Sequence, residues 1–221
     1  MSHLMPTMFE AYAKILHRIE ASYENIDKPL SHDEMAILNI PPCAELKSLV
    51  ESRRNDPKSP RVSWRELAET LNVPFTSEIN LEWYAKKLEQ GCWPRFLCGP
   101  DEGRLSRDEC AQLVSVLETF TKNGECFLRF AEMPFITTGK PLLFHGVLHE
   151  LGAFLKEKAY QITPEYWWPP NNDWCVCSDY DLKFTVVGGS RELIANLLKN
   201  DVLECLEVQS HTRIDYLAPM P

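Results

Sequence analysis

The chain has 221 residues, of which 44% are hydrophobic and 25% are charged, so it is long enough to bury a core without help from a metal or a disulfide. Its 23 Lys and Arg are outnumbered by 32 Asp and Glu, which leaves a formal net charge of −9. That balance argues against a protein whose main task is to neutralise the phosphates of nucleic acids or anionic lipids.

The first half of the sequence is expected to be helical. Apolar residues recur at helical spacing within residues 8–24, and a second apolar stripe follows Pro41 and Pro42. Ser63 and Ser106 are each followed three residues later by a glutamate, which is the pattern of a capping box at the start of a helix. Helices are therefore predicted over residues 8–24, after Pro42, and over residues 64–71, 81–89 and 110–120.

After residue 124 the pattern changes to short strands, which are predicted at residues 126–130, 140–144, 174–178, 184–187 and 205–208. Helices are predicted at residues 147–156 and, with Ser190 as the cap, at residues 191–199. The fold class is therefore α+β, with a mainly helical N-terminal half packed on a small mixed or antiparallel sheet that carries helices. We predict one domain over residues 1–221, with a helical subregion at about 1–122 and an α+β subregion at about 123–221.

The acidic residues are unevenly distributed along the chain. Residues 101–221 carry 11 Lys and Arg against 18 Asp and Glu, a net charge of −7. This half of the chain would attract a cationic partner, and the attraction would weaken at high salt. The alternative is that the acidic surface only keeps the protein soluble.

The sequence predicts a cytoplasmic protein without a membrane partner. Residues 1–10 lack the basic and then apolar regions of a secretory signal. No run of 18 apolar residues occurs, so no membrane-spanning helix is expected.

Eight cysteines are present, but their spacing is not that of a disulfide scaffold or a zinc knuckle. Cys92 and Cys98 are six residues apart, and Cys175 and Cys177 would point the same way from a strand. A metal site that combines these four is conceivable, yet reduced thiols are the default in a cytoplasmic chain. We therefore predict no metal and no cofactor.

His145 and His149 would point the same way on a helix, as the histidines of metal-binding helices do. A zinc hydrolase also needs a glutamate at a set position between or beside them, and Gly146 and Leu148 occupy those places. His145 moreover follows a predicted strand. A metal-dependent or thiol-dependent enzyme that uses these histidines and some cysteines is kept as the alternative function, and no catalytic residue is assigned.

Residues 62–74 look like the first half of a helix-turn-helix motif. The second helix of such a motif should present basic and amide side chains to DNA. The following segment carries Glu78 and Glu82 instead, and a capped amphipathic core helix explains the pattern equally well. A DNA-binding regulator is therefore the second alternative, and no nucleic-acid partner is predicted.

The densest aromatic cluster follows residue 165. Trp and Tyr often anchor protein interfaces, and nearby aspartates would give this apolar centre an acidic rim. The alternative is that the tryptophans cover an edge of the sheet, and that the aspartates only shape a turn between strands. The predicted partner-binding residues are Tyr166, Trp167, Trp168, Asp173, Trp174, Asp179 and Asp181.

Several of these segments resemble the C-terminal signature of a family of bacterial proteins that has no settled function. The matching segments are Tyr166-Trp-Trp-Pro169, Asn172-Asp-Trp-Cys-Val176, Ser178-Asp-Tyr-Asp-Leu182, Val187-Gly-Gly-Ser190 and Glu192-Leu-Ile-x-x-Leu-Leu198. Phe9-x-Ala-Tyr-Ala-Lys-Ile-Leu-His17 and Val62-Ser-Trp-Arg-Glu-Leu-Ala68 are similar to N-terminal segments of the same family. The resemblance implies no activity and no catalytic residues.

These observations together predict a non-enzymatic cytoplasmic binding protein. In its most concrete form it is an immunity-type protein that neutralises a cationic toxin or effector by protein–protein contact. The predicted partner is a basic protein.

Overall fold

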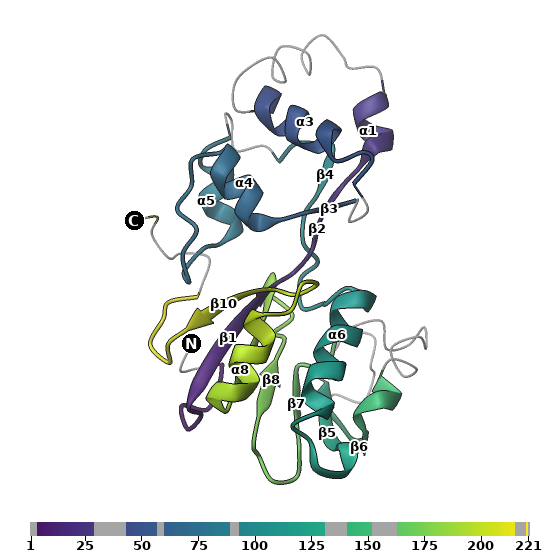
Figure 1. Cartoon of the computed structure of the whole chain (residues 1–221), viewed down its shortest axis with the longest axis vertical. Coiled ribbons are helices and arrows are strands. Elements are labelled where there is room, and N and C mark those ends of the chain that lie inside the picture. Colours follow the sequence, from purple (N-terminus) through teal and green to yellow (C-terminus); the bar gives the residue numbers. More distant parts are fainter. Residues whose placement is uncertain are drawn as a thin grey trace. The chain divides into compact units, whose positions relative to one another are not determined.

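The structure is a computed structural model that describes residues 4–28, 43–56, 60–88, 93–130, 141–151, 163–214 and 220. The chain folds as two compact units (Figure 1). Unit 1 consists of Met1–His17 and Asp101–Thr212, and unit 2 consists of Arg18–Pro100 and Arg213–Pro221. The boundary expected near residue 122 therefore falls inside unit 1, which joins the start of the chain to its second half.

Unit 1 is built on a seven-stranded sheet in which all neighbouring strands are antiparallel, in the order β10-β1-β9-β8-β7-β5-β6. The strands are β1 (Ala11–Leu16), β5 (Glu125–Phe130), β6 (Leu142–Val147), β7 (Tyr166–Trp168), β8 (Cys175–Cys177), β9 (Phe184–Gly189) and β10 (Glu204–Val208). The strands β5, β6, β8, β9 and β10 confirm the five that the sequence predicts. The sequence pattern predicts no strand at residues 166–168, where the structure has β7.

The predicted helix over residues 8–24 is wrong, and this error changes the fold class. Residues Ala11–Leu16 form β1, which pairs with β9 on one side and with β10 on the other. All six of its residues are buried, and a strand covered on both faces lacks the alternating pattern that distinguishes it from a helix. The chain continues into β2 (Ile19–Ala21) and then into α1 (Tyr23–Asp27), a helix of only five residues.

The fold class predicted from the sequence is corrected accordingly. The N-terminal half is not mainly helical, and the sheet is neither small nor mixed. The main element of the protein is the seven-stranded antiparallel sheet of unit 1, and its second strand in space comes from the N-terminal part of the chain.

Two helices of unit 1 pack on one face of this sheet, α6 (Arg107–Glu118) and α8 (Arg191–Leu198) (Figure 1). Both confirm predicted helices. The Ser106–Glu109 capping box is formed, and the Ser190 hydroxyl accepts a hydrogen bond from the Leu193 N–H. The core between helices and sheet takes alternate strand residues, including Ala11, Ala13, Ile15, Cys126, Leu128, Phe130, Trp167, Val176 and Val187.

The opposite side of the sheet, which we call the far face, is crossed by the N-terminal segment. The Tyr12 hydroxyl donates a hydrogen bond to the Pro6 carbonyl at 2.8 Å. Phe9 lies so close to Gly188 on β9 that a Cβ atom at this position would come within 2.5 Å of the Phe9 ring. Glycine at position 188 therefore lets the segment lie directly on the sheet.

A buried histidine follows β1 and ties together three segments of unit 1. His17 Nδ1 lies 2.7 Å from the Asp101 carbonyl oxygen, so this nitrogen carries the proton and donates. Nε2 then accepts from the Thr185 hydroxyl at 2.9 Å, and Thr185 Oγ1 lies 2.7 Å from Ser178 Oγ. Burial lowers the pKa of His17 to about 4, against the opposing effect of the bond to Asp101. The imidazole is therefore neutral at pH 7.

Unit 2 contains a three-stranded antiparallel sheet in the order β3-β2-β4, together with helices. Its further elements are α3 (Cys43–Ser52), β3 (Arg61–Val62), α4 (Trp64–Thr70), α5 (Leu81–Ala85) and β4 (Leu97–Cys98). The helices predicted after Pro42, at 64–71 and at 81–89 are confirmed, although α5 is shorter than predicted. The Ser63–Glu66 capping box of α4 is formed in both directions.

Two sequence predictions fall wholly or partly outside the described residues. The helix predicted at 147–156 is described only as far as residue 151, where a 3₁₀ turn spans Leu148–Glu150. Cys92 also lies outside these residues. Of the helices in the described parts of the chain, none is long and apolar enough to cross a membrane.

Candidate functional site

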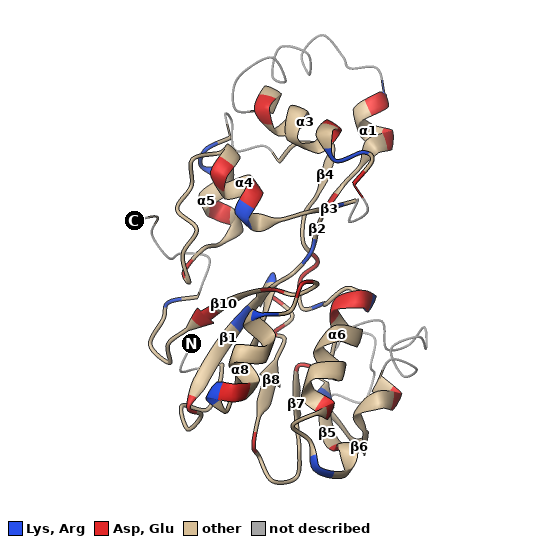
Figure 2. Ribbon diagram, viewed as in Figure 1, with Lys and Arg blue, Asp and Glu red and all other residues tan. Residues whose placement is uncertain are grey.

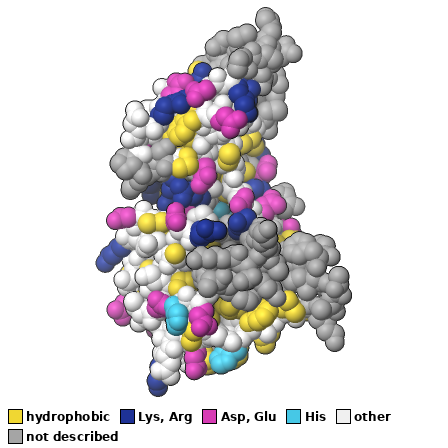
Figure 3. All heavy atoms as spheres, turned by 90° about the vertical axis from the view of Figure 1, so that its right-hand side faces the viewer, with side chains coloured by type: hydrophobic (Ala, Val, Ile, Leu, Met, Phe, Trp, Pro, Cys, Tyr) yellow, Lys and Arg dark blue, Asp and Glu magenta, His cyan; other side chains and the backbone are white. Residues whose placement is uncertain are grey.

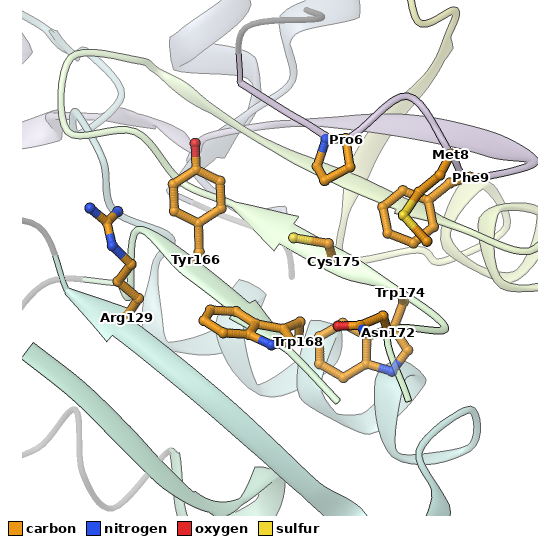
Figure 4. Close-up of a pocket in the computed structure, with 9 residues that line it drawn as sticks. All are labelled: Pro6, Met8, Phe9, Arg129, Tyr166, Trp168, Asn172, Trp174 and Cys175. Atoms are coloured by element: carbon orange, nitrogen blue, oxygen red, sulfur yellow. The ribbon is translucent and has the colours of Figure 1, made fainter. Parts of the chain in front are cut away.

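The far face of unit 1 carries a hollow of about 390 Å³, which we call the aromatic hollow. It is lined by Pro6, Met8, Phe9, Arg129, Tyr166, Trp168, Asn172, Trp174 and Cys175. Figure 4 shows Pro6, Met8 and Phe9 on one side of the hollow, Trp168 on the other, and Cys175 between them. Mostly apolar and aromatic walls with a few polar groups are typical of a binding pocket.

The alternation of strand residues brings the sheet side of this hollow together. Tyr166 and Trp168 flank the core residue Trp167 on β7, so both side chains turn to the far face. Cys175 turns the same way on β8, where it is paired with Gly188 of β9. The N-terminal segment supplies the remaining wall, and the Tyr166 hydroxyl holds it by donating to the Leu4 carbonyl at 3.0 Å.

Three rings on neighbouring strands stack beside the hollow, and we call them the ring row. Phe127 on β5 is paired with Trp168 on β7 and with His145 on β6. Its ring centroid lies 5.7 Å from that of Trp168 and 4.7 Å from that of His145, with interplanar angles of 28° and 26°. These are stacked arrangements, so one face of the Trp168 ring is covered by Phe127.

The charged side chain in the lining of the aromatic hollow is Arg129. It forms an ion pair with Glu165, and its guanidinium carbon lies 5.6 Å from the centroid of the Tyr166 ring. Burial raises the pKa of Glu165, although the attraction of Arg129 acts the other way. Because Glu165 balances the charge of Arg129, this end of the hollow does not favour an ionic group of either sign.

A second hollow of about 320 Å³ shares Met8, Phe9, Asn172 and Trp174 with the first. Two exposed carboxylates, those of Glu10 and Asp173, belong to its lining. The Glu10 carboxylate also accepts a hydrogen bond of 3.2 Å from the Arg191 N–H, at the start of α8. This second hollow is also lined by Phe120 and Leu193, which belong to the helix side of the sheet. An acidic site at the end of the sheet therefore adjoins the aromatic hollow.

The predicted tryptophans are divided between the core and this surface. Trp167 and Trp174 have no exposed surface, and their rings meet edge to face with centroids 6.5 Å apart. Trp174 Nε1 donates to the Thr121 hydroxyl at 3.0 Å. Trp168 and Tyr166 are half-buried at the hollow, so these two are the aromatic residues of the predicted cluster that can meet a partner.

The three predicted aspartates lie on two turns. Asp173 lines the second hollow and accepts a hydrogen bond from the Asn171 amide. Asp179 Oδ1 accepts the N–H of Asp181 at 2.9 Å, which is the local bond of an Asx turn. The linings of the two hollows include Asp173 but not Asp179 or Asp181. The structure therefore brings Tyr166, Trp168 and Trp174 together at the aromatic hollow and places Asp173 at the adjoining second hollow. The Asp179 turn belongs to neither lining.

Four buried thiols of unit 1 are held in their protonated form by burial. Cys175 and Cys177 are buried side by side on the same face of β8, as the sequence predicts. Burial raises the pKa of each of them, and that of Cys110, to about 12, and it raises the pKa of Cys126 to about 11. A thiol reacts as a thiolate, so these four cysteines are poor nucleophiles.

The two histidines of the alternative prediction do not share a helix. His145 lies on strand β6, where it is exposed, and His149 lies on the 3₁₀ turn that follows. Within the described ranges, no group of three or more His, Cys, Asp or Glu side chains could hold a metal ion.

The segment that resembles a helix-turn-helix contains α4, but the next helix is short. Helix α5 has five residues and is capped by Asn80, whose side chain accepts a hydrogen bond from the Trp83 N–H. Trp83 and Tyr84 are buried, and the Tyr84 hydroxyl donates to the Trp64 carbonyl at 2.6 Å. These contacts make α5 a packing element of unit 2.

The residues of the site that were not among the predicted partner-binding residues are Pro6, Met8, Phe9, Phe127, Arg129, Asn172 and Cys175. The alternation within residues 126–130 could have indicated Phe127 and Arg129. Because side chains alternate along a strand, these two lie on the face of the sheet away from the core residues Cys126 and Leu128. No local pattern marked the N-terminal segment. Besides Tyr12 of β1, it contacts β7, β8 and β9, which follow more than 150 residues later.

No protein-family model matches the chain, and searches of curated proteins and of solved structures found no significant match either. The resemblance to the bacterial family therefore stays a prediction from the sequence.

Proposed function

We propose that the chain is a non-enzymatic, cytoplasmic binding protein that contacts a partner protein through the far face of unit 1. The observation that carries this proposal is the aromatic hollow, an apolar pocket that opens on the protein surface beside the half-buried Trp168. Met8 stands on its rim with 70% of its surface exposed. Aromatic and methionine side chains are enriched at protein interfaces, where they fill pockets in the partner.

The chemistry of the described residues supports binding rather than catalysis. The buried thiols of Cys175 and Cys177, whose pKa burial raises to about 12, are protonated at neutral pH, so they do not supply a nucleophile. The paired carboxylates of Asp179 and Asp181 sit on an Asx turn and not in a pocket. The best-formed polar group at the hollow, the Arg129–Glu165 pair, is an internally balanced ion pair.

The partner that we propose is a basic protein, and the finer proposal is an immunity-type protein that neutralises a cationic toxin or effector. Glu10 and Asp173 place two carboxylates beside the apolar pocket. Elsewhere the charges are mixed: Figure 2 shows Asp and Glu on both units, and on the face in Figure 3 they lie among Lys and Arg. Complementary charge would speed and orient the encounter, and the pocket would supply the stable contact.

Site-specific photocrosslinking tests this proposal. A benzoylphenylalanine in place of Met8 is expected to capture one basic protein in the cytoplasm of cells that make the chain. The same group in place of Tyr180, which is 61% exposed on the Asp179 turn, is the matched control and should not capture it.

The captured protein must then bind the native chain when both are purified. Titration calorimetry should give an affinity that falls as salt is added, because part of the attraction is electrostatic. Equal capture at positions 8 and 180, or no binding between the purified proteins, would contradict the proposed function.

A further inference from the structure

We propose that the aromatic hollow receives an uncharged aromatic ring from a side chain of the partner protein, and that this ring stacks on Trp168 as the fourth member of the ring row. This inference rests on the proposed function, since it names the partner group that the site recognises. It commits to a tyrosine, tryptophan or phenylalanine side chain.

The first step concerns the face of Trp168 that is left for a ligand. In the sheet, β7 lies between β5 and β8. Phe127 of β5 covers the face of the Trp168 ring that is turned toward β5, and the two ring planes meet at an angle of 28°. The other face of the ring is therefore turned toward β8, and this is where the aromatic hollow lies, with Cys175 of β8 in its lining.

The second step concerns the walls around that free face. Pro6, Met8 and Phe9 stand across the hollow from Trp168, as Figure 4 shows. A flat ring that enters would be held between the Trp168 ring and these apolar side chains. Stacked and edge-to-face aromatic pairs gain stability beyond their buried area, which favours an aromatic ring over an aliphatic group of similar size.

The third step concerns size and charge. A volume of about 390 Å³ is near the lower end of the roughly 300–1,000 Å³ that small-molecule pockets occupy, so it suits one or two rings and not a dinucleotide. The Arg129–Glu165 pair at one end disfavours an ionised ring of either sign, because each charge already has its partner. The Asn172 side-chain amide, which also lines the hollow, can form a hydrogen bond with a phenol hydroxyl or an indole N–H of the inserted ring.

The fourth step concerns the source of the ring. The rim residue Met8 is 70% exposed, so the hollow is open to a side chain whose backbone stays outside. The adjoining carboxylates of Glu10 and Asp173 would face basic residues next to the inserted ring. A ring on a basic polypeptide fits both features, whereas a free ring compound would use only the first.

Solution NMR of the whole chain provides the test, with the Met8 methyl group and the Trp168 indole N–H as two reporters. The free probes are p-cresol, 3-methylindole and, as a non-aromatic control, cyclohexanol. The peptide probes are a lysine-flanked tryptophan peptide and the same peptide with alanine in place of tryptophan. We expect the two ring compounds and the tryptophan peptide to shift both reporters, and the two controls to have little effect.

Variants of the chain locate the binding. Trp168→Leu keeps an apolar side chain but removes the stacking face, and it should weaken ring binding by roughly two- to tenfold, read from the Met8 methyl. Met8→Lys changes an exposed rim residue that does not support the fold, and it should weaken binding of the lysine-flanked peptide, read from the Trp168 indole. Tyr180→Ala, at an exposed ring outside the hollow, should bind as the wild type does.

Each other outcome overturns the inference. The absence of shifts at probe concentrations of about 10 mM, where a millimolar site is filled, would show that the hollow takes no ring. Equal binding of cyclohexanol would remove the role of stacking. Binding of the free rings without the tryptophan peptide would assign the hollow to a small molecule. If Met8 photocrosslinking still captures a partner in any of these cases, the proposed function stands and only this inference fails.

Discussion

Acidification should destabilise unit 1 through a single buried side chain, His17. Its neutral imidazole donates to the Asp101 carbonyl and accepts from the Thr185 hydroxyl. A second proton on Nε2 would turn that acceptor into a donor, and Thr185 would have to redirect its hydroxyl toward Ser178. The burial cost of the charged ring, which has no exposed surface, is added to this rearrangement.

The size and sign of the effect follow from the pKa. Burial lowers the pKa of His17 from 6.5 to about 4, so the unfolded chain takes up the proton first as the pH falls. The contribution of His17 to stability is therefore complete above pH 6.5, is lost as the pH falls from 6.5 to 4, and changes no further below that. At about 1.4 kcal/mol for each pH unit, the loss amounts to about 3 kcal/mol.

Urea unfolding between pH 4 and pH 7 measures this loss. Fluorinated tryptophan gives unit 1 its own NMR signals, since Trp167 and Trp174 lie in unit 1 and Trp64 and Trp83 in unit 2. The reference is His17→Gln, whose side chain does not titrate, so the carboxylates shared by both proteins cancel in the difference. That difference in unfolding free energy should shrink by about 3 kcal/mol between pH 7 and pH 4. A difference that stays constant over this range would refute the reasoning.

Three further substitutions test the packing of unit 1, each measured by urea unfolding. Gly188→Ala should cost about 1–3 kcal/mol, because its Cβ would collide with the Phe9 ring, and adding Phe9→Ala should recover part of the loss. Trp174→Phe should cost about 1 kcal/mol more than Trp167→Phe, because only the Trp174 indole N–H has a hydrogen-bond partner; equal costs would contradict this. Ser106→Ala should cost about 1 kcal/mol through the lost cap of α6, and an unchanged midpoint would count against the capping box.

Sequence patterns predicted an element correctly where the interactions that form it lie within a few residues of each other. The serine–glutamate pairs at residues 63–66 and 106–109 predicted the starts of α4 and α6, because a capping box closes within four residues. The strands β5, β8 and β9 were also predicted, because alternating or β-branched residues within one short segment favour a strand. The same reasoning failed for residues 8–24, where the apolar pattern fits both a helix and a strand that is buried on both faces.

The candidate site was predictable only in part. The aromatic cluster after residue 165 indicated the correct region, but the sequence could not separate the half-buried Trp168 from Trp167 and Trp174, which have no exposed surface. Side chains alternate along a strand, so the roles of Trp167 and Trp168 depend on which face of β7 packs against α6 and α8. That choice is made by the other strands of the sheet.

The sequence by itself determined the acidic balance of the chain, its capped helices and most strands of its second half. Only the tertiary structure decided that residues 11–16 form an inner strand, that the far face bears the aromatic hollow, and that His17 is buried and neutral. Each of these depends on segments more than 80 residues apart in the chain, such as His17 with Asp101 and Thr185, or Phe9 with Gly188. A local pattern carries no information about such pairs, because their contacts form only when the sheet brings the segments together.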